Sequence, residues 1–270
     1  MKTYSIIGAI IGDIIGSVYE QINTRSATFP LFTKRNRFTD DTVMTIAIAD
    51  WLLHGGTLPH IMQEWGKYRY PYRGYGGMFR KWLASDNPQP YISYGNGGAM
   101  RVSPVGFYAQ TLEETLSLAR QTAIVSHNHP DGIAGAEAIV TSVFLARNGT
   151  NKNEIRHHII SSYGYNLMLK CQDIPPRFTI KASITCPAAI IAFLDSSDYE
   201  SAIRLAISLG GDSDTIACMA GGIAAAYYGI PSTIVDRART YLPDDMLAII
   251  DEFDNRISVS YTHLTLPTIA

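Results

Sequence analysis

The chain has 270 residues, of which 46% are hydrophobic and 17% charged, and its 22 lysines and arginines against 24 acidic residues give a net charge of −2. This composition excludes a disordered or fibrous protein and supplies enough apolar residues for a substantial core. Because the charges nearly balance, nothing in the overall composition favours binding to nucleic acid or to an anionic membrane, and we expect neither partner.

The first predicted element is a helix in the apolar run of residues 5–18, SIIGAIIGDIIGSV. Asp13 interrupts this run and no small-residue cleavage pattern follows it, which excludes a signal peptide and a membrane span. Gly8, Gly12 and Gly16 recur every four residues and therefore share one helix face. Since glycine costs a helix roughly 1 kcal/mol per position, this stripe predicts that another backbone approaches closely. The three cysteines contain no Cys-x-x-Cys pair, which excludes a disulfide scaffold or thiolate zinc site and favours a cytoplasmic protein.

Apolar residues keep helical spacing along most of the remaining chain, and few segments alternate as strands do. A second helix is predicted over 41–53, where Gly55 and Gly56 stop it. The segment 66–111 is rich in Gly, Pro, Tyr and Asn, and it is predicted to be a long functional loop. Further helices are predicted at 112–124, 133–147, 152–170, 182–194, 199–209, 215–228, 232–241 and 244–256.

The domain organisation follows from the lack of repeats and linkers in the sequence. We expect one all-α domain, a compact orthogonal arrangement of helices over residues 1–257, present as a monomer. Residues 258–270, SVSYTHLTLPTIA, contain no Lys, Arg, Asp or Glu and no helical periodicity. We interpret them as a non-native or disordered tail, and no functional argument depends on them.

Two acidic clusters stand at predicted helix starts, Thr39-Asp40-Asp41-Thr42 and Gly211-Asp212-Ser213-Asp214-Thr215. Helix capping explains either cluster alone, because such side chains bind the free N–H groups of a helix N-terminus. Together they supply four carboxylates beside threonine hydroxyls, with no Lys or Arg inside either motif. Buried carboxylates this close must be protonated, paired or metal-bound. Hard oxygen ligands suit Mg²⁺, Mn²⁺ or Ca²⁺, so two helix starts that meet would form a site for a pair of divalent ions.

Three further segments are candidates for ligand binding. The glycine-rich stretch 93–106, SYGNGGAMRVSPVG, can line an anion site with backbone N–H groups, although an ordinary turn is the alternative. It has neither the Gly-Lys-Ser/Thr of a Walker loop nor the βαβ frame of a dinucleotide fingerprint. The motif SHNHP (126–130) lacks a third soft metal ligand nearby, which favours a substrate contact or a capping loop. Residues 67–82 interleave tyrosines with basic residues, a pattern typical of nucleotide stacking or of arginine packed on tyrosine at a surface.

In combination, these blocks resemble the ADP-ribosylglycohydrolase family, which includes dinitrogenase-reductase-activating glycohydrolase and the ADP-ribosyl-acceptor hydrolases. The resemblance extends from about Gly8 to Tyr228, and its blocks occur in the order typical of the family. The blocks are GAIIGDIIGSVYE (8–20), FTDDTVM (38–44), SYGNGGAMRVSPVG (93–106), SHNHP (126–130) and LGGDSDTIACMAGGIAAAYYG (209–229).

The resemblance implies a hydrolase with two Mg²⁺ or Mn²⁺ ions at the bottom of an ADP-ribose cleft, acting on the ADP-ribose moiety of a modified protein or small molecule. It implies that Glu20 activates water or gates the site, and that Asp41 and Asp214 take part in catalysis. The metal ligands that it implies are Thr39, Asp40, Asp41, Asp212, Asp214 and Thr215. The positions that it implies for ADP-ribose binding are Ser93, Tyr94, Gly95, Asn96, Gly97 and His127.

Two other functions are compatible with an Asp-rich helical protein. An isoprenoid-synthase-like enzyme would use Asp-Asp-x-x-Asp, but Met44 stands where the last aspartate is needed. A non-catalytic ADP-ribose-binding or structural protein would be indicated by a lost aspartate, and all four are present. The acceptor joined to ADP-ribose is left open: arginine, serine, a nucleic acid and a small conjugate share the same ADP-ribose half.

Overall fold

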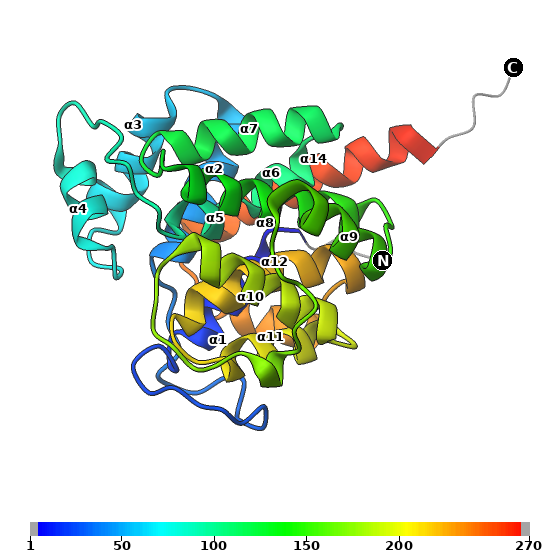
Figure 1. Cartoon of the computed structure of the whole chain (residues 1–270). Coiled ribbons are helices and arrows are strands. Elements are labelled where there is room, and N and C mark those ends of the chain that lie inside the picture. Colours follow the sequence, from blue (N-terminus) through cyan, green and yellow to red (C-terminus); the bar gives the residue numbers. More distant parts are fainter. Residues whose placement is uncertain (1–4, 266–270) are drawn as a thin grey trace, which may run out of the picture.

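Helix α12 (Ser213–Tyr228) lies at the centre of the fold, as Figure 1 shows in the computed structural model, which describes residues 5–265. Its residues from Ser213 to Ala225 are all buried, because helices α1, α8, α10 and α11 pack around it. The small side chains of this helix allow neighbours to approach on several sides.

The helices are connected by turns and loops, and between residues 5 and 265 the only β-type pairing is a single bridge between Gly95 and Lys181. The predicted all-α fold is confirmed. The elements are α1 (Ile7–Gly16), α2 (Asp40–His54), α3 (Leu58–Gln63), the π-helix η1 (Glu64–Arg69), α4 (Gly77–Ala84), α5 (Gly97–Met100), α6 (Ser103–Tyr108), α7 (Leu112–Ile124), α8 (Pro130–Arg147), α9 (Lys152–Tyr163), the 3₁₀ turn η2 (Cys171–Asp173), α10 (Ala182–Asp195), α11 (Tyr199–Ser208), α12, α13 (Ser232–Arg239) and α14 (Asp244–Thr265).

The glycine stripe of α1 lies directly against α12. A Cβ atom placed on Gly12 would stand 2.0 Å from the carbonyl oxygen of Ala217, and one placed on Gly16 would stand 2.5 Å from Cα of Asp214. These distances leave no room for a side chain, so the predicted close approach of two backbones is confirmed. The contact places the last turn of α1 beside the first turn of α12, with Asp13 next to the stripe.

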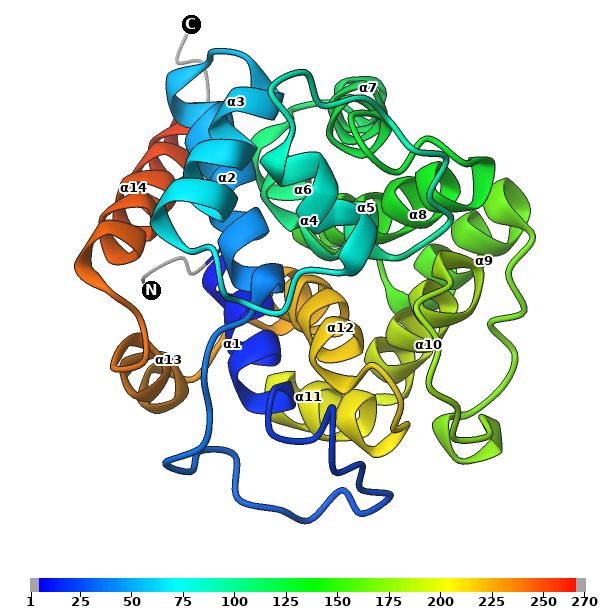
Figure 2. The ribbon, with the colours of Figure 1, turned by 90° about the vertical axis from the view of Figure 1, so that its left-hand side faces the viewer.

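Helix α2 carries the first acidic cluster at its N-terminus and packs against α1, α6 and α14 (Figure 2). Its N-terminal turn meets the first turn of α12, because Thr215 of α12 donates a hydrogen bond to Asp41 of α2. Thr39 is the N-cap residue of α2, and its hydroxyl accepts a bond from the backbone N–H of Asp41 at 3.4 Å. Helix capping, the alternative explanation for the first acidic cluster, is therefore confirmed for Thr39.

Some predicted boundaries differ from the structure. The segment 66–111 is not one long loop, because it contains the end of η1 and the short helices α4, α5 and α6. Helix α9 ends at Tyr163 instead of 170, since Gly164 adopts a left-handed φ of 68° that terminates it. Helix α14 passes the predicted end at 256 and reaches Thr265. The last part of the predicted tail, 266–270, lies outside the described residues, and its non-native origin stays a prediction.

Candidate active site

Asp13 organises the start of α2 from a neighbouring helix. Its carboxylate is fully buried and accepts bonds from the Thr39 backbone N–H at 2.8 Å and the Thr39 hydroxyl at 2.7 Å. It also accepts bonds from the backbone N–H and the hydroxyl of Thr42, at 3.1 and 2.5 Å. These four bonds fix α1 to the N-terminal turn of α2. Sequence reasoning missed this role and used Asp13 only as evidence against a signal peptide.

The two acidic clusters meet at this point. Thr215 in the first turn of α12 donates a hydrogen bond of 3.2 Å to Oδ2 of Asp41 in the first turn of α2. Carboxylate oxygens within 4.8 Å of one another form two groups of three, Asp13 with Asp41 and Asp214, and Glu20 with Asp212 and Asp214. Asp214 belongs to both groups, so the five carboxylates form one continuous acidic centre.

Burial raises the pKa values of the aspartates in this centre. The pKa of Asp41 is raised well above its ordinary value by burial and by the neighbouring charges of Asp13 and Asp214. Burial, followed by the charge of Asp212, does the same for the pKa of Asp214. The pKa of Asp40 is raised to about 8 by burial and the charge of Asp13. In residues 5–265 no ion pair with a basic side chain compensates these charges.

The acidic centre has the chemistry of a divalent cation site. Oδ1 of Asp41 is buried and has no hydrogen-bond partner among the described residues. Leaving a buried carboxylate oxygen without a partner is costly, and a cation would remove that cost. The ligands that the centre offers are hard oxygens, which suit Mg²⁺ and Mn²⁺ better than softer metals. Asp40 lies at the same helix end but in neither group of three.

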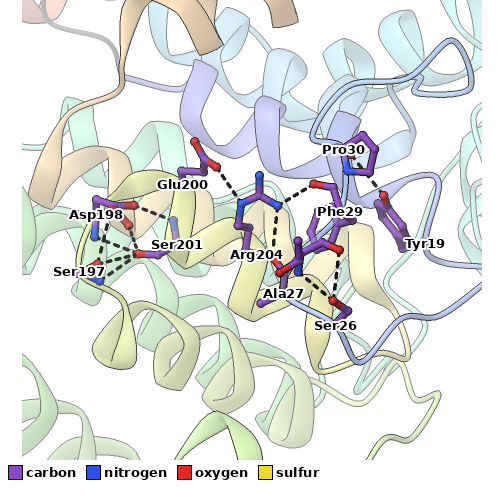
Figure 3. Close-up of polar contacts among 11 residues, drawn as sticks. Tyr19, Ser26, Ala27, Phe29, Pro30, Ser197, Asp198, Glu200, Ser201 and Arg204 are labelled. Carbon is purple, nitrogen blue, oxygen red and sulfur yellow. Dashed lines mark hydrogen bonds and ion pairs between the residues drawn. The ribbon is translucent and has the colours of Figure 1, made fainter.

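Glu20 reaches the centre from the loop between α1 and α2. Asn23 fixes this loop to the second acidic cluster, because its side chain accepts from the Gly211 N–H at 2.9 Å and donates to the Glu20 carbonyl at 3.1 Å. Figure 3 shows a second anchor, in which Arg204 of α11 donates to the carbonyls of Ala27 and Phe29, at 3.2 and 2.7 Å. The loop is thus held at two places while the Glu20 side chain remains partly exposed.

The glycine-rich loop approaches the acidic centre from another direction. The side-chain amide of Asn96 donates a bond of 2.7 Å to Oδ2 of Asp212. The loop is held in place by the stretch before α10, since Asn96 N–H donates to the Ile180 carbonyl at 2.8 Å and Ala182 N–H donates to the Tyr94 carbonyl at 3.0 Å. The loop after Ser93 therefore lies beside the second acidic cluster.

His127 lies against this loop in a defined orientation. Its Nε2 would be 2.7 Å from a Cβ atom on Gly97, while Nδ1 is 2.8 Å from the hydroxyl of Ser126. Arg101, which can only donate, bonds to that same hydroxyl at 2.9 Å. Nδ1 is the only acceptor that contacts the Ser126 hydroxyl in the described part of the chain, so the hydroxyl donates its hydrogen to Nδ1. The hydrogen of the neutral ring is therefore on Nε2. Burial and the charge of Arg101 lower the pKa of His127 well below its ordinary value, so the ring is neutral.

A cavity of about 500 Å³ joins these parts, a volume typical of small-molecule sites. The acidic centre forms its base, and Phe178, Ile180 and the segment from Tyr72 to Phe79 contribute to its walls. Of the predicted ADP-ribose positions, Tyr94 does not line the cavity; it is 47% exposed with its ring edge-on to His129. The predicted positions that do line it are Ser93, Gly95, Asn96, Gly97 and His127.

Comparison with known proteins points to one family. The family model for ADP-ribosylglycohydrolase matches residues 3–262. ADP-ribosylhydrolase ARH3 of Mus musculus is 29% identical, covering 90% of this chain and 88% of its own. ADP-ribosylarginine hydrolase Tri1 of Pseudomonas putida (strain GB-1) is 24% identical, covering 84% of this chain and 70% of its own. A solved structure of an ADP-ribosylglycohydrolase-related protein complex has the same fold, with a TM-score of 0.69, 23% identity, and coverage of 97% and 96%.

Proposed function

Because the chain belongs to the ADP-ribosylglycohydrolase family, we propose that it is a hydrolase that uses two divalent cations to cleave the bond between ADP-ribose and an N- or O-linked acceptor. The acceptor is the side chain of a modified protein or a small conjugate. The observation that carries this proposal is the continuous acidic centre at the base of a cavity of about 500 Å³, with a glycine-rich loop beside it. In addition, none of the helices within residues 5–265 is long and apolar enough to cross a membrane.

The residues around the acidic centre fit a pair of Mg²⁺ or Mn²⁺ ions. Both carboxylate groups would supply ligands, and Asp214 belongs to each of them. The unpartnered Oδ1 of Asp41 is available to one of them. The full proposed ligand set, Asp13 added to the positions predicted from the sequence, is Asp13, Thr39, Asp40, Asp41, Asp212, Asp214 and Thr215. Bound divalent cations supply Lewis-acid polarisation and orient water in sites of this kind.

The chain's own groups hold the substrate and move a proton. We expect the Gly97 N–H, which makes no hydrogen bond among the described residues, and the Nε2–H of His127 to donate to the diphosphate and ribose oxygens. Glu20 is our candidate base: it is partly exposed to water and lies within 4.8 Å of Asp212 and Asp214, measured between carboxylate oxygens.

Hydrolysis exchanges one bond at the anomeric carbon for another. As the bond from that carbon to the acceptor nitrogen or oxygen breaks, the ribose develops oxocarbenium character. Water forms the new carbon–oxygen bond and gives its proton to Glu20, which returns a proton to the departing acceptor. Asp41 and Asp214 would take part in this step by holding the cations at the base of the cavity.

Calorimetric titration of ADP-ribose into the purified protein, with Mg²⁺ and again with excess chelator, tests the proposal. We expect binding that weakens when the metal is removed, together with release of ADP-ribose from modified proteins only in the metal-loaded state. Full hydrolysis in chelator would contradict the metal-dependent mechanism. Binding without hydrolysis of arginine-, serine- or nucleotide-linked substrates would favour the non-catalytic ADP-ribose-binding alternative.

A further inference from the structure

Two segments that contribute residues to the cavity wall are strongly basic. Residues 21–39 contain four Lys or Arg residues and residues 65–85 contain five, and neither segment has an Asp or Glu. The whole chain has a net charge of −2, so this concentration is local. A local field of one sign beside a cleft selects ligands of the opposite sign.

Arg37 and Arg73 bring this charge into the cavity wall. The guanidinium carbon of Arg73 lies 3.9 Å from the ring centroid of Phe38, which meets the ring of Tyr70 edge-on. Stacking on buried Phe38 orients the Arg73 guanidinium and reduces the entropy that it loses on binding. Between residues 5 and 265 no ion pair involves either arginine.

The arginines and the glycine-rich loop approach the acidic centre at different carboxylates. Asn96 contacts the centre through Asp212, whereas Phe38 directly precedes Thr39. On the same side as Phe38, a Cβ atom on Gly74, next to Arg73, would stand 3.2 Å from Oδ1 of Asp40. This inference rests on the proposed function, in which the glycine-rich loop holds the diphosphate. The acceptor then leaves through the part of the cavity next to Arg37 and Arg73.

We propose that Arg37 and Arg73 form an acceptor-binding site that recognises carboxylate side chains next to the modified residue. The preferred substrate is then an ADP-ribosylated acidic peptide segment whose acceptor carries no positive charge, such as an oxygen-linked side chain. Arginine forms paired hydrogen bonds with carboxylates, which gives this site its specificity. An ADP-ribosylated arginine would place a third guanidinium beside two others, which disfavours it.

A peptide fits this site better than a nucleic acid. Two arginines match one or two carboxylates, whereas nucleic-acid binding needs cations along a run of phosphates. An oligonucleotide substrate therefore serves as a competing outcome in the test.

Binding of two synthetic peptides, each ADP-ribosylated on one serine and flanked by either glutamates or lysines, tests this site by fluorescence anisotropy in Mg²⁺. The measurement is made in the Glu20→Gln background, which lacks the candidate base, so that the peptides are not hydrolysed. We expect the glutamate peptide to bind about tenfold more tightly, with a ratio that falls in high salt. The double variant Arg37→Gln/Arg73→Gln should reduce the ratio to about one and leave the affinity for free ADP-ribose unchanged. Arg80→Gln, a basic residue of the same segment that does not line the cavity, is the matched control.

Three results, besides the lack of any flank preference, would overturn the acceptor site. The first is an unchanged peptide preference in the double variant. The second is an equal loss of affinity for free ADP-ribose, which would assign the arginines to the diphosphate. The third is tighter binding of an ADP-ribosylated oligonucleotide than of the acidic peptide. Failure of the wild-type protein to bind ADP-ribose at all would refute the proposed function itself. Binding of ADP-ribose without a flank preference would refute only the acceptor site.

Discussion

The hydroxyl of Thr215 donates a hydrogen bond of 3.2 Å to Oδ2 of Asp41, and this bond joins acidic clusters from opposite ends of the chain. Helix α1 makes the contact possible, since Asp13 holds the start of α2 while the glycine stripe admits α12. The site therefore depends on the packing of three helices as much as on its carboxylates.

Asp214→Asn tests the carboxylate that both groups share. We expect kcat/KM to fall by about 100-fold or more, because even residues that only support metal ligands are worth 10- to 100-fold. In chelator the variant should be at least as stable as the wild type, since the substitution removes like-charge repulsion and the burial of a charge. Thermal unfolding with and without Mg²⁺, beside initial rates, measures both effects.

Glu113→Gln, an exposed acidic residue at the start of α7, is the control for that experiment. It should keep both the activity and the thermal shift with Mg²⁺. If Asp214→Asn retained the full metal-induced shift, Asp214 would not be a metal ligand.

The pH dependence of stability should reverse when metal is added. The pKa of Asp40 is raised to about 8, and burial also raises the pKa values of Asp41 and Asp214. The folded metal-free protein therefore keeps protons that the unfolded chain releases above about pH 4, so its free energy of unfolding falls as the pH rises toward 8. Metal ligands must be deprotonated, so stabilisation by Mg²⁺ should grow over the same range.

Melting temperatures at pH 6 and pH 8, in chelator and in Mg²⁺, check this prediction. We expect the metal-free protein to melt at a lower temperature at pH 8 than at pH 6, and the increase due to Mg²⁺ to be larger at pH 8. An increase of equal size at both pH values would show that the carboxylates are already ionised before metal binds.

Most residues of the candidate site could be recognised in the sequence because they occur in short local motifs. The helix starts at Asp41 and Asp214 and the loop at Asn96 could each be recognised from neighbouring residues, and the structure brings all three together. Asp13 could not be recognised in this way. Its hydrogen-bond partners come from α2, so its role exists only once α1 and α2 have packed.

The fold shows the same division between local and tertiary effects. Long amphipathic helices were predicted from apolar spacing, but α5 and α6 were not, because helices of four and six residues have no stability of their own. Packing against α8 stabilises both of them. Conversely, the sequence contains a local signal for the end of α9, the glycine at position 164. The apolar periodicity of 152–170 obscured this signal, and in the structure Gly164 adopts a left-handed φ that terminates the helix.

Ser126→Ala tests the orientation of His127. The substitution removes the hydroxyl that bonds to Nδ1, so the imidazole should lose its uniform Nε2–H form. Nitrogen chemical shifts of the ring, measured by NMR on the free protein, should change from one tautomer to a mixture. We expect affinity for ADP-ribose to fall about tenfold, the effect of one lost hydrogen bond.

Ser142→Ala is the matched control, because this buried serine bonds to the Ala138 carbonyl within α8 instead of to a histidine. It should leave the His127 shifts and the affinity for ADP-ribose unchanged. If Ser126→Ala bound ADP-ribose as the wild type does, the Nε2–H of His127 would not be a substrate contact.

Gly12→Ala tests how far the acidic centre depends on the contact between α1 and α12. The new Cβ would lie 2.0 Å from the Ala217 carbonyl oxygen, a distance that only a shift of one backbone can relieve. Overpacking of this kind costs about 1–3 kcal/mol, so we expect a clear drop in melting temperature. Because Asp13 follows Gly12 directly, the shift should also weaken Mg²⁺ binding. Gly76→Ala, where a Cβ atom meets nothing within 4 Å, should leave the melting temperature unchanged, and equal stability of the two variants would contradict the close packing.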